Sequence, residues 1–299
     1  MHSDPRAERV IESAQRQVQA GRAAEAAALL QTLVNDLARS SAHRDQRRAA
    51  FEMLIDLLQA LGRDARLSKV FQQYAGAYAH TPDAEFDRLY VAGLLATRTS
   101  ALPLRRRDRF HWLIGELGKT LALEGAVAEC GCYRGLSSYL ICSRMKQQRA
   151  AFDGSGYQIY DSFQGLSAPQ AEDTGPAPEG AQSPHPSDVQ PGRFSASLAE
   201  VKRALAAFPG VEYFPGWIPQ AFPATTDQRY RFVHVDVDLY QPTRDSFEYF
   251  WPRLVQGGVM VCDDYNWTGA RRAVEEFCSA RGARFDASPF NQAVIQRSG

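Results

Sequence analysis

Three common signals are missing from this 299-residue chain. No apolar stretch approaches the roughly 20 residues that span a bilayer, and the N-terminal sequence MHSDPRAERV is charged and has no signal-peptide core. Net charge is missing too, because 34 Lys and Arg residues balance 34 Asp and Glu residues. Without a broad basic field, we expect neither a nucleic acid nor a membrane as a partner.

Cysteine is scarce, and its spacing argues against zinc. The chain has five cysteines, and a single residue separates Cys130 from Cys132, without the spacing of a CxxC motif or a paired His motif. Most of the cysteines lie in apolar strand or helix patterns, which is typical of small buried side chains in a reducing compartment. We therefore expect a cytoplasmic protein.

The first hundred residues have the apolar spacing of helices. Gly21 and Gly62 fall at breaks between these patterns, and AGRAAEAAALLQTLV resembles one tetratricopeptide unit without a convincing second copy. Residues 1–100 are therefore predicted to form an all-helical region. We expect a bundle that packs on the following domain or forms a homo-oligomer, with a peptide-binding solenoid as the alternative.

From residue 101 to 299 the pattern changes to strands that alternate with helices, which predicts an α/β domain with a parallel, doubly wound sheet. Gly257 and Gly258 are predicted to form a turn, and the last two strands an antiparallel hairpin. The run Arg105 to Arg107, followed by Asp108 and Arg109, is predicted to be the solvated face of a helix. The expected strands are 126–130, 157–161, 211–214, 232–237, 259–262, 284–287 and 293–296.

Carboxylates follow two of these strands. Asp236 and Asp238 come at the end of one strand, and Asp263 and Asp264 end the next. Because the carboxyl ends of parallel strands meet at one edge, these side chains are expected to share a pocket. Grouped carboxylates repel one another unless a cation neutralises them, and oxygen ligands favour Mg²⁺, with Mn²⁺ or Ca²⁺ as alternatives. In the alternative interpretation, these residues only cap the helices that follow.

A glycine turn follows the first strand, but it is not the G-x-G-x-x-G fingerprint of dinucleotide binding. Gly131 and Gly135 have G-x-x-x-G spacing, and Glu129 precedes them. Glu129 could hold the ammonium group of an amino-acid cofactor, and Asp161, at the end of the second strand, could bond ribose hydroxyls. Gly135 and Ser137 begin a helix whose free amides favour an anionic group. Together these signals favour S-adenosylmethionine over NAD.

The segment from Gly165 to Arg193 has neither strand nor helix spacing. It is rich in proline and in small or acidic residues. Loops of this length inside a compact domain are usually functional or disordered. Since it follows a predicted ligand-binding strand end, we expect a mobile lid.

The chain resembles the macrocin O-methyltransferase family. The motifs VAECGCYRGLSS, YDSFQGL, GRFSASLAEV, PGWIPQAFP, HVDVDLYQPTRDS and GGVMVCDDYNWTGARRAVEEF occur in the order found in that family. The resemblance extends from about Arg98 to Phe277 and implies a Rossmann-like class I methyltransferase sheet. It also implies use of S-adenosylmethionine and Mg²⁺ to methylate a hydroxyl on the sugar of a natural product.

The resemblance also implies roles for individual residues. Asp236, Asp263 and Asp264 would hold the metal, and Asp236 would also be the catalytic base. Trp217 and Ile218 would border the adenine. The remaining cofactor-binding residues would be Glu129, Gly131, Tyr133, Gly135, Ser137, Asp161 and Ser162. Cys132-Tyr133-Arg134 departs from the Val-Trp-Lys/Arg type of turn in many relatives, and the Pro-rich segment differs from the macrolide enzymes, which leaves the acceptor open.

Two questions stay open at this point. A carboxylate bound to Mg²⁺ is a weak base, so Asp238 or His234 could take the proton instead of Asp236. His234 lies inside a predicted strand and is expected to be a core histidine or to support Asp236 from behind. In the competing functional hypothesis, the chain is a scaffold protein whose helical region binds a partner and whose methyltransferase-like domain is auxiliary.

Overall fold

The computed structural model describes residues 4–39, 43–99, 104–176 and 189–298. It divides into two compact units, Met1–Asp108 and Arg109–Gly299, and each is described by itself. Among the described residues, no helix is both long and apolar enough to cross a bilayer.

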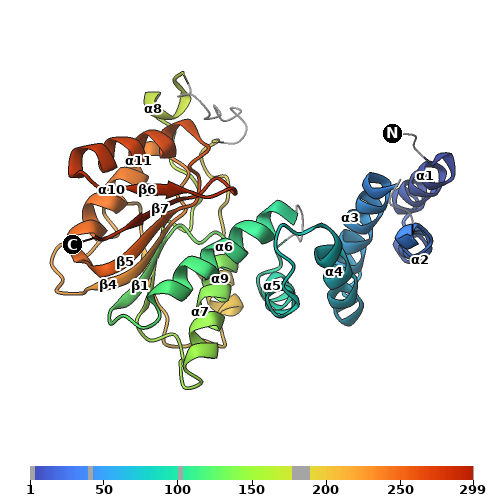
Figure 1. Cartoon of the computed structure of the whole chain (residues 1–299), viewed down its shortest axis with the longest axis horizontal. Helices are drawn as coiled ribbons and strands as arrows, with labels where there is room; N and C mark the ends of the chain where they lie inside the picture. The colour runs from blue at the N-terminus through green and yellow to red at the C-terminus, as the bar shows by residue number, and fades with distance from the viewer. Residues whose placement is uncertain (1–3, 40–42, 100–103, 177–188, 299) are drawn as a thin grey trace. The chain divides into compact units, whose positions relative to one another are not determined.

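The first unit is helical, and its helices begin and end at identifiable residues (Figure 1). The Asp4 and Asp83 side chains accept backbone N–H groups at the starts of α1 and α5, while Gly21 and Gly62 adopt positive φ angles after the ends of α1 and α3. From α1 to α5, each α-helix packs on the next one along the chain. The helices are α1 Pro5–Gln19, α2 Ala23–Asp36, η1 Leu37–Arg39, α3 Arg44–Ala60, α4 Asp64–Tyr78 and α5 Ala84–Thr97, followed by α6 Leu104–Thr120, which begins in this unit.

The prediction of a solvated arginine face is wrong for Arg107. This side chain is fully buried, and its guanidinium lies 2.8 Å from Asp87 Oδ1 and 2.9 Å from Asp108 Oδ1. Arg107 precedes the apolar Phe110 and Ile114 by three and seven residues, so it shares their face of α6. The side chain of Arg105 lies outside the described residues.

The second unit is built on a seven-stranded sheet in the order β3-β2-β1-β4-β5-β7-β6. The first five strands of this order run parallel, and β7 is antiparallel to both β5 and β6. The predicted α/β fold, with a mostly parallel sheet and a closing hairpin, is confirmed. The strands are β1 Ala126–Cys130, β2 Tyr157–Asp161, β3 Glu212–Pro215, β4 Tyr230–Val235, β5 Leu254–Cys262, β6 Phe285–Ala287 and β7 Ala293–Gln296.

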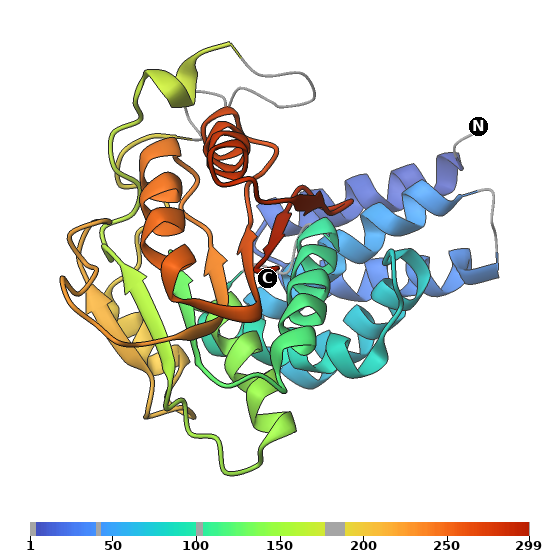
Figure 2. The same ribbon diagram turned by 60° about the vertical axis from the view of Figure 1, so that its left-hand side comes forward.

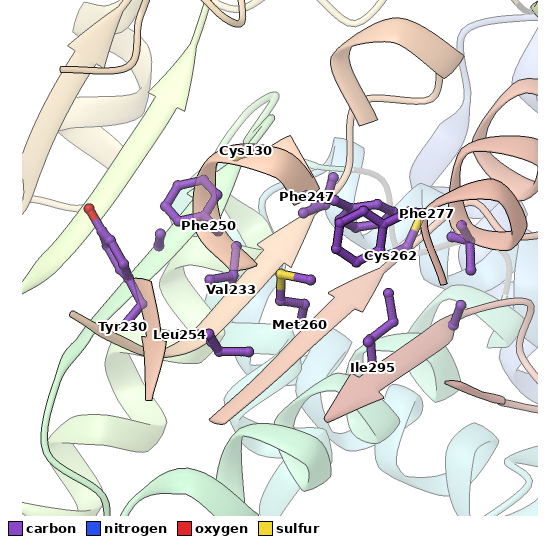
Figure 3. Close-up of a cluster of buried hydrophobic side chains, with 14 of the residues drawn as sticks. Cys130, Tyr230, Val233, Phe247, Phe250, Leu254, Met260, Cys262, Phe277 and Ile295 are labelled. Atoms are coloured by element: carbon purple, nitrogen blue, oxygen red, sulfur yellow. The ribbon is translucent and has the colours of Figure 1, made fainter. Parts of the chain in front are cut away.

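Helices cover both faces of this sheet (Figures 1 and 2). On one face, α10 Tyr240–Phe250 and α11 Thr268–Arg281 pack on β1, β4, β5 and β7, and their aromatic side chains fill the core (Figure 3). Helices α7 Leu136–Gln148 and α9 Leu198–Ala204 lie on the other face. The central strand β1 is buried along its whole length, as expected for a parallel strand covered on both sides.

The prediction of a turn at Gly257 and Gly258 is wrong, because both glycines lie inside β5. Gly257 has φ of +77°, and the β4–β5 register shifts beside it. Gly257 donates a backbone hydrogen bond to Arg297, and Arg297 donates one back to Gly258. The glycines therefore form an irregularity within a strand, a common place for glycine in a sheet.

Candidate functional site

Three central strands end side by side at one edge of the sheet. Cys130 of β1 is aligned with Val235 of β4, and Val235 is aligned with Cys262 of β5. The ladder continues one residue further, because Asp236 donates its backbone N–H to Cys130 and Asp263 donates to Val235, at 2.8 and 2.9 Å. The glycine turn after β1 and the two acidic strand ends therefore meet, as the parallel-sheet argument predicts.

Gly131 and Asp236 are in direct contact at this edge. Gly131 has φ of +79°, and a Cβ atom at this position would lie 1.9 Å from the backbone oxygen of Asp236. Only glycine satisfies both the backbone angle and the close approach. The predicted cofactor turn is thus packed against the first predicted metal ligand.

The four carboxylates form one cluster. Asp263 and Asp264 are each 4% exposed, whereas Asp236 and Asp238 are half-buried. The carboxyl groups of Asp236 and Asp238 both lie beside that of Asp264. Asp238 has φ of +58°, a strained backbone for a residue other than glycine, and such strain is often found at functional sites.

The carboxylates do not cap the helices that follow. The N-cap residues of α10 and α11 are Leu239 and Trp267, not the aspartates, and neither N-cap side chain accepts a hydrogen bond from its helix. The backbone N–H of Tyr240, in the first turn of α10, instead donates to the Asp173 carboxylate at 2.7 Å. The capping alternative is therefore wrong for Asp238 and Asp264.

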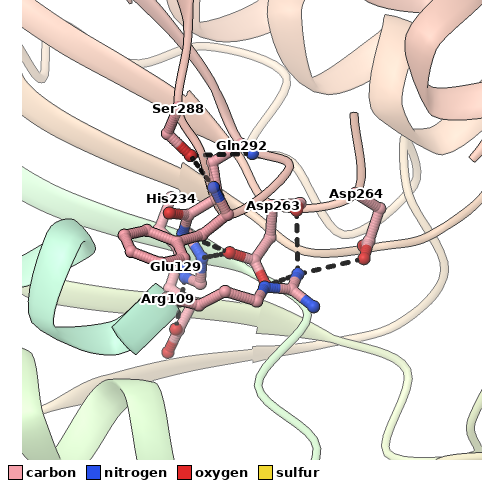
Figure 4. A network of polar contacts seen from close by, with 8 residues as sticks. Arg109, Glu129, His234, Asp263, Asp264, Ser288 and Gln292 are labelled. Atoms are coloured by element: carbon pink, nitrogen blue, oxygen red, sulfur yellow. Dashed lines mark hydrogen bonds and ion pairs between the residues drawn. The ribbon is translucent and has the colours of Figure 1, made fainter. Parts of the chain in front are cut away.

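Arg109 is a cation of this cluster that the sequence pattern did not reveal (Figure 4). One guanidinium nitrogen, Nη2, contacts Asp263 Oδ2 at short range and donates to the backbone oxygen of Asp263 at 2.8 Å and to Asp264 Oδ1 at 3.2 Å. Burial lowers the pKa of Arg109, but Asp263, Asp264 and Asp236 outweigh this effect and raise it. Arg109 therefore carries a permanent positive charge beside the carboxylates.

A buried polar chain supports the cluster from inside the sheet. His234 Nδ1 lies 2.9 Å from Glu129 Oε1, and its Nε2 lies 3.6 Å from Asp263 Oδ1. Glu129 Oε2 accepts hydrogen bonds from Ser138 and, at 2.6 Å, from the Tyr157 hydroxyl. Burial alone would lower the pKa of His234, but Asp263 and Glu129 raise it to about 10. His234 is thus a fully buried core histidine, as its strand position predicted, and its ring lies between Glu129 and Asp263.

The environment divides the carboxylates into two kinds. Burial alone would raise the pKa of Asp263, but Arg109 and His234 hold it below its ordinary value. Burial and neighbouring carboxylates raise the pKa of Asp236 and Asp238 well above the ordinary value. Asp263 therefore stays ionised, while Asp236 and Asp238 are suited to hold a proton.

The residues of the cofactor turn lie around Asp161. Its Oδ2 accepts the backbone N–H of Cys132 at 2.7 Å, and its Oδ1 accepts that of Phe163 at 2.6 Å. Ser162 donates its hydroxyl to the Gly165 carbonyl at 3.0 Å. Asp161 thus ties the turn after β1 to the turn after β2, and each of its oxygens keeps a lone pair for a ligand.

Other predicted cofactor residues have more varied surroundings. Gly135, with φ of +85°, is the N-cap residue of α7, and Ser137 is buried in its first turn. The Tyr133 ring meets that of Phe194 edge-on, with centroids 5.7 Å apart. Glu129 is fully buried, and both of its carboxylate oxygens interact inside the fold. Its predicted contact with the cofactor stays a prediction.

Trp217 and Ile218 follow β3 at the same end of the sheet. Trp217 is 38% exposed, so its ring is accessible to a ligand. Ile218 is partly buried and packs against the hydrophobic core. Their place beside β3 is compatible with the adenine contact that the family resemblance implies, which also stays a prediction.

The Pro-rich segment is closed at its base. Leu166 donates its backbone N–H to Arg193, and Gly192 donates to Leu166, both at 2.9 Å. Asp173 is buried and accepts the N–H groups of Gln170 and Tyr240, which fixes the short helix α8 Ala171–Thr174 next to α10. The part of the expected lid between residues 177 and 188 lies outside the described residues.

The donor set fits a hard divalent cation. Asp264 Oδ2 is buried, and no donor among the described residues reaches it. In the described part of the chain, ligand atoms of His234, Asp236 and Asp263 lie within 4.8 Å of one another. Carboxylate oxygens are the ligands that Mg²⁺ prefers, whereas imidazole is more typical of softer metal ions. The assignment of Asp236, Asp263 and Asp264 as the ligands of the ion stays a prediction.

Comparison with known proteins supports this picture. The family model described as macrocin-O-methyltransferase (TylF) matches residues 99–293, more than half of the chain. A Streptomyces olivaceus protein, 8-demethyl-8-(2,3-dimethoxy-alpha-L-rhamnosyl)-tetracenomycin-C 4'-O-methyltransferase, is 26% identical over 212 residues, 67% of this chain and 75% of the relative. Mycinamicin III 3''-O-methyltransferase of Micromonospora griseorubida is 28% identical over 172 residues, 53% of this chain and 62% of the relative.

Solved structures share the fold. The O-methyltransferase NovP aligns with a TM-score of 0.54 at 19% identity, covering 81% of this chain and 100% of NovP. The calicheamicin methyltransferase CalS11 aligns with a TM-score of 0.52 at 18% identity, covering 73% of this chain and 94% of CalS11. The predicted methyltransferase fold and O-methyltransferase class are confirmed, and the chain belongs to the macrocin-O-methyltransferase (TylF) family.

Proposed function

We propose that this chain transfers a methyl group from S-adenosylmethionine to a hydroxyl of a sugar or glycosylated natural product, with Mg²⁺ as the preferred ion. Two relatives are named as enzymes that methylate numbered oxygens of tetracenomycin and mycinamicin compounds, and the first name includes a rhamnosyl group. This chain aligns with 62% to 75% of the length of those relatives. The acceptor class is therefore carried over as part of the proposal.

The contact between Gly131 and Asp236 is the observation that carries the proposal. It places the turn that would hold the cofactor directly against the acidic cluster that would hold the acceptor hydroxyl. Methyl transfer needs the acceptor oxygen and the methyl carbon at close range, and such positioning is worth several kcal/mol of the barrier. The backbone contact between Gly131 and Asp236 supports this proposal, because it keeps the cofactor turn and the acidic cluster close together.

The chemistry divides among the carboxylates. The acceptor oxygen gains a methyl group and loses its proton, so a group of the chain must take that proton. Asp236, or Asp238 where Asp236 binds the ion, is the proposed acceptor of the proton, because both follow β4 at the edge that meets the cofactor turn, whereas Asp263 is paired with Arg109. A bound divalent cation would supply charge that lowers the pKa of the hydroxyl. Asp161 is proposed to receive the ribose hydroxyls with the lone pairs left on its two oxygens.

The test separates cofactor binding from methyl transfer. After treatment with EDTA, we expect S-adenosylmethionine to bind as before in calorimetry, while transfer of labelled methyl to glycosides with neighbouring hydroxyls is lost until Mg²⁺ returns. Asp161→Ala should weaken cofactor binding, whereas Asp263→Asn should mainly abolish turnover. Undiminished transfer in the EDTA-treated protein, or equal loss of cofactor affinity in both variants, would contradict the assignment.

In this proposal, the helical unit has a role in oligomer formation only. Residues 1–98 lie before the segment matched by the family model. We propose that this unit supports a homo-oligomer, and light scattering of the full chain tests this assignment. A monomeric mass at micromolar concentration would contradict it.

A further inference from the structure

Arg109 takes a large share of the oxygens that a metal ion would need. Its Nη2 contacts Asp263 Oδ2 and lies 3.2 Å from Asp264 Oδ1. Asp263 Oδ1 accepts a hydrogen bond from Gln292 Nε2 at 2.6 Å and faces His234 at 3.6 Å. Of the four carboxylate oxygens on this pair, only Asp264 Oδ2 has no donor among the described residues.

A guanidinium and a divalent ion cannot use these oxygens at the same time without cost. Like charges about 4 Å apart repel strongly in a partly buried site, and each ligand of a hard cation must direct a lone pair at the ion. Arg109 bonds the two aspartates that would contribute such lone pairs from the end of β5. Four carboxylates share this edge and repel one another, and the positive charge of Arg109 offsets part of this repulsion.

The side chain of Arg109 is more exposed than those of the two aspartates that it contacts. About a quarter of it is exposed, 25%, compared with 6% and 5% for the side chains of Asp263 and Asp264. Its guanidinium ends a long flexible stem, which can keep contact with the protein while the charged end turns toward solvent. Asp263 is held by the sheet ladder through its backbone N–H, and the side chains of Asp263 and Asp264 are both buried.

We propose that Arg109 is a built-in competitor of the metal ion, a cation that must release Asp263 and Asp264 before both can bind a divalent cation. This inference rests on the proposed function, because it takes these aspartates as metal ligands. In this proposal, Arg109 raises the concentration of divalent ion that is needed for the aspartates to bind it. Binding of a divalent ion and the Arg109 contacts then oppose each other, and removal of the arginine strengthens ion binding.

Mn²⁺ binding tests the competition without any acceptor. We expect Arg109→Gln to bind Mn²⁺ about tenfold more tightly than the unchanged chain, as measured by calorimetry and by the loss of the free-ion electron paramagnetic resonance signal. Arg271→Gln is the matched control. Arg271 lies over the ring of Tyr265, next to Asp264, but its guanidinium pairs with Glu275 at 2.8 Å. This control should change Mn²⁺ affinity less than twofold.

Each outcome decides the proposal. Unchanged or weaker Mn²⁺ binding by Arg109→Gln, or an equal gain in Arg271→Gln, overturns the competition and leaves the methyl-transfer proposal intact. Absence of Mn²⁺ binding in every variant overturns both this inference and the metal assignment. If Arg109→Gln does not fold, Arg109→Lys replaces it, because the lysine side chain is shorter and its ammonium does not extend as far as the Arg109 Nη2 atom that contacts both aspartates. Tighter binding by at least about threefold then supports the competition, and unchanged or weaker binding refutes it.

Discussion

Gly131→Ala is the change that most directly tests whether the site depends on the contact between the Gly131 turn and the Asp236 backbone. The added Cβ would lie 1.9 Å from the Asp236 oxygen and 2.8 Å from its carbonyl carbon. Since real Cβ contacts stay above about 3 Å, the two backbones would have to separate by about 1 Å. Gly131 also has φ of +79°, which alone costs a residue with a side chain about 1 kcal/mol.

The expected loss exceeds that of backbone strain alone. Overpacking of this kind typically costs about 1–3 kcal/mol, so Gly131→Ala should lower the free energy of unfolding by about 2–4 kcal/mol in total. A displacement of 1 Å at a reacting group can reduce turnover by about 100-fold. We therefore expect weaker cofactor binding and a large loss of methyl transfer in protein that still folds at low temperature.

Gly156→Ala supplies the matched control. Gly156 has φ of +81°, but no heavy atom lies within 4 Å of a Cβ at this position. It should lose about 1 kcal/mol by urea unfolding and keep its affinity for S-adenosylmethionine in calorimetry. The reasoning is refuted if both variants lose the same stability and the same cofactor affinity.

Two further predictions concern the residues around the cluster. His234 has a pKa raised from 6.5 to about 10, so its stabilising contribution is complete below pH 6.5 and lost as the pH rises through 10. In urea unfolding, the free energy of unfolding of the unchanged chain should exceed that of His234→Gln, and this difference should fall by about 1.4 kcal/mol per pH unit across this range. A difference that rises with pH would contradict the assignment. Asp173→Ala should lower the free energy of unfolding by about 1–2 kcal/mol in the same assay, because it leaves the Tyr240 N–H without its partner. Thr174 is exposed, so Thr174→Ala should change this free energy little. Equal effects of the two changes would count against the role of Asp173.

The strands and the two halves of the site could be predicted because their signals are local. Period-two and buried apolar runs marked β1 and β2 at their observed bounds, and parallel-sheet topology then brought Gly131 and Asp236 to one edge. The glycines at 257 and 258 gave the wrong prediction because a turn and a strand irregularity require the same backbone freedom.

The partners of the cluster could not be predicted because their contacts span long distances in sequence. Arg109 and Asp263 are 154 residues apart, and Asp173 and Tyr240 are 67 apart. No spacing rule connects such pairs before the fold is known. For Arg107, a local signal did exist, since its helical position matches the apolar face of α6.

The hydrogen bonds between Leu166 and the pair Gly192 and Arg193 have a consequence for how this protein can change. They bring the two ends of the Pro-rich segment together, so residues between Asp173 and Gly192 can be added, removed or exchanged without pulling on β2 or α9. Doubling the length of a flexible loop costs only about 0.6 kcal/mol. The segment is thus a place where sequences from related enzymes can be grafted while the sheet edge stays the same.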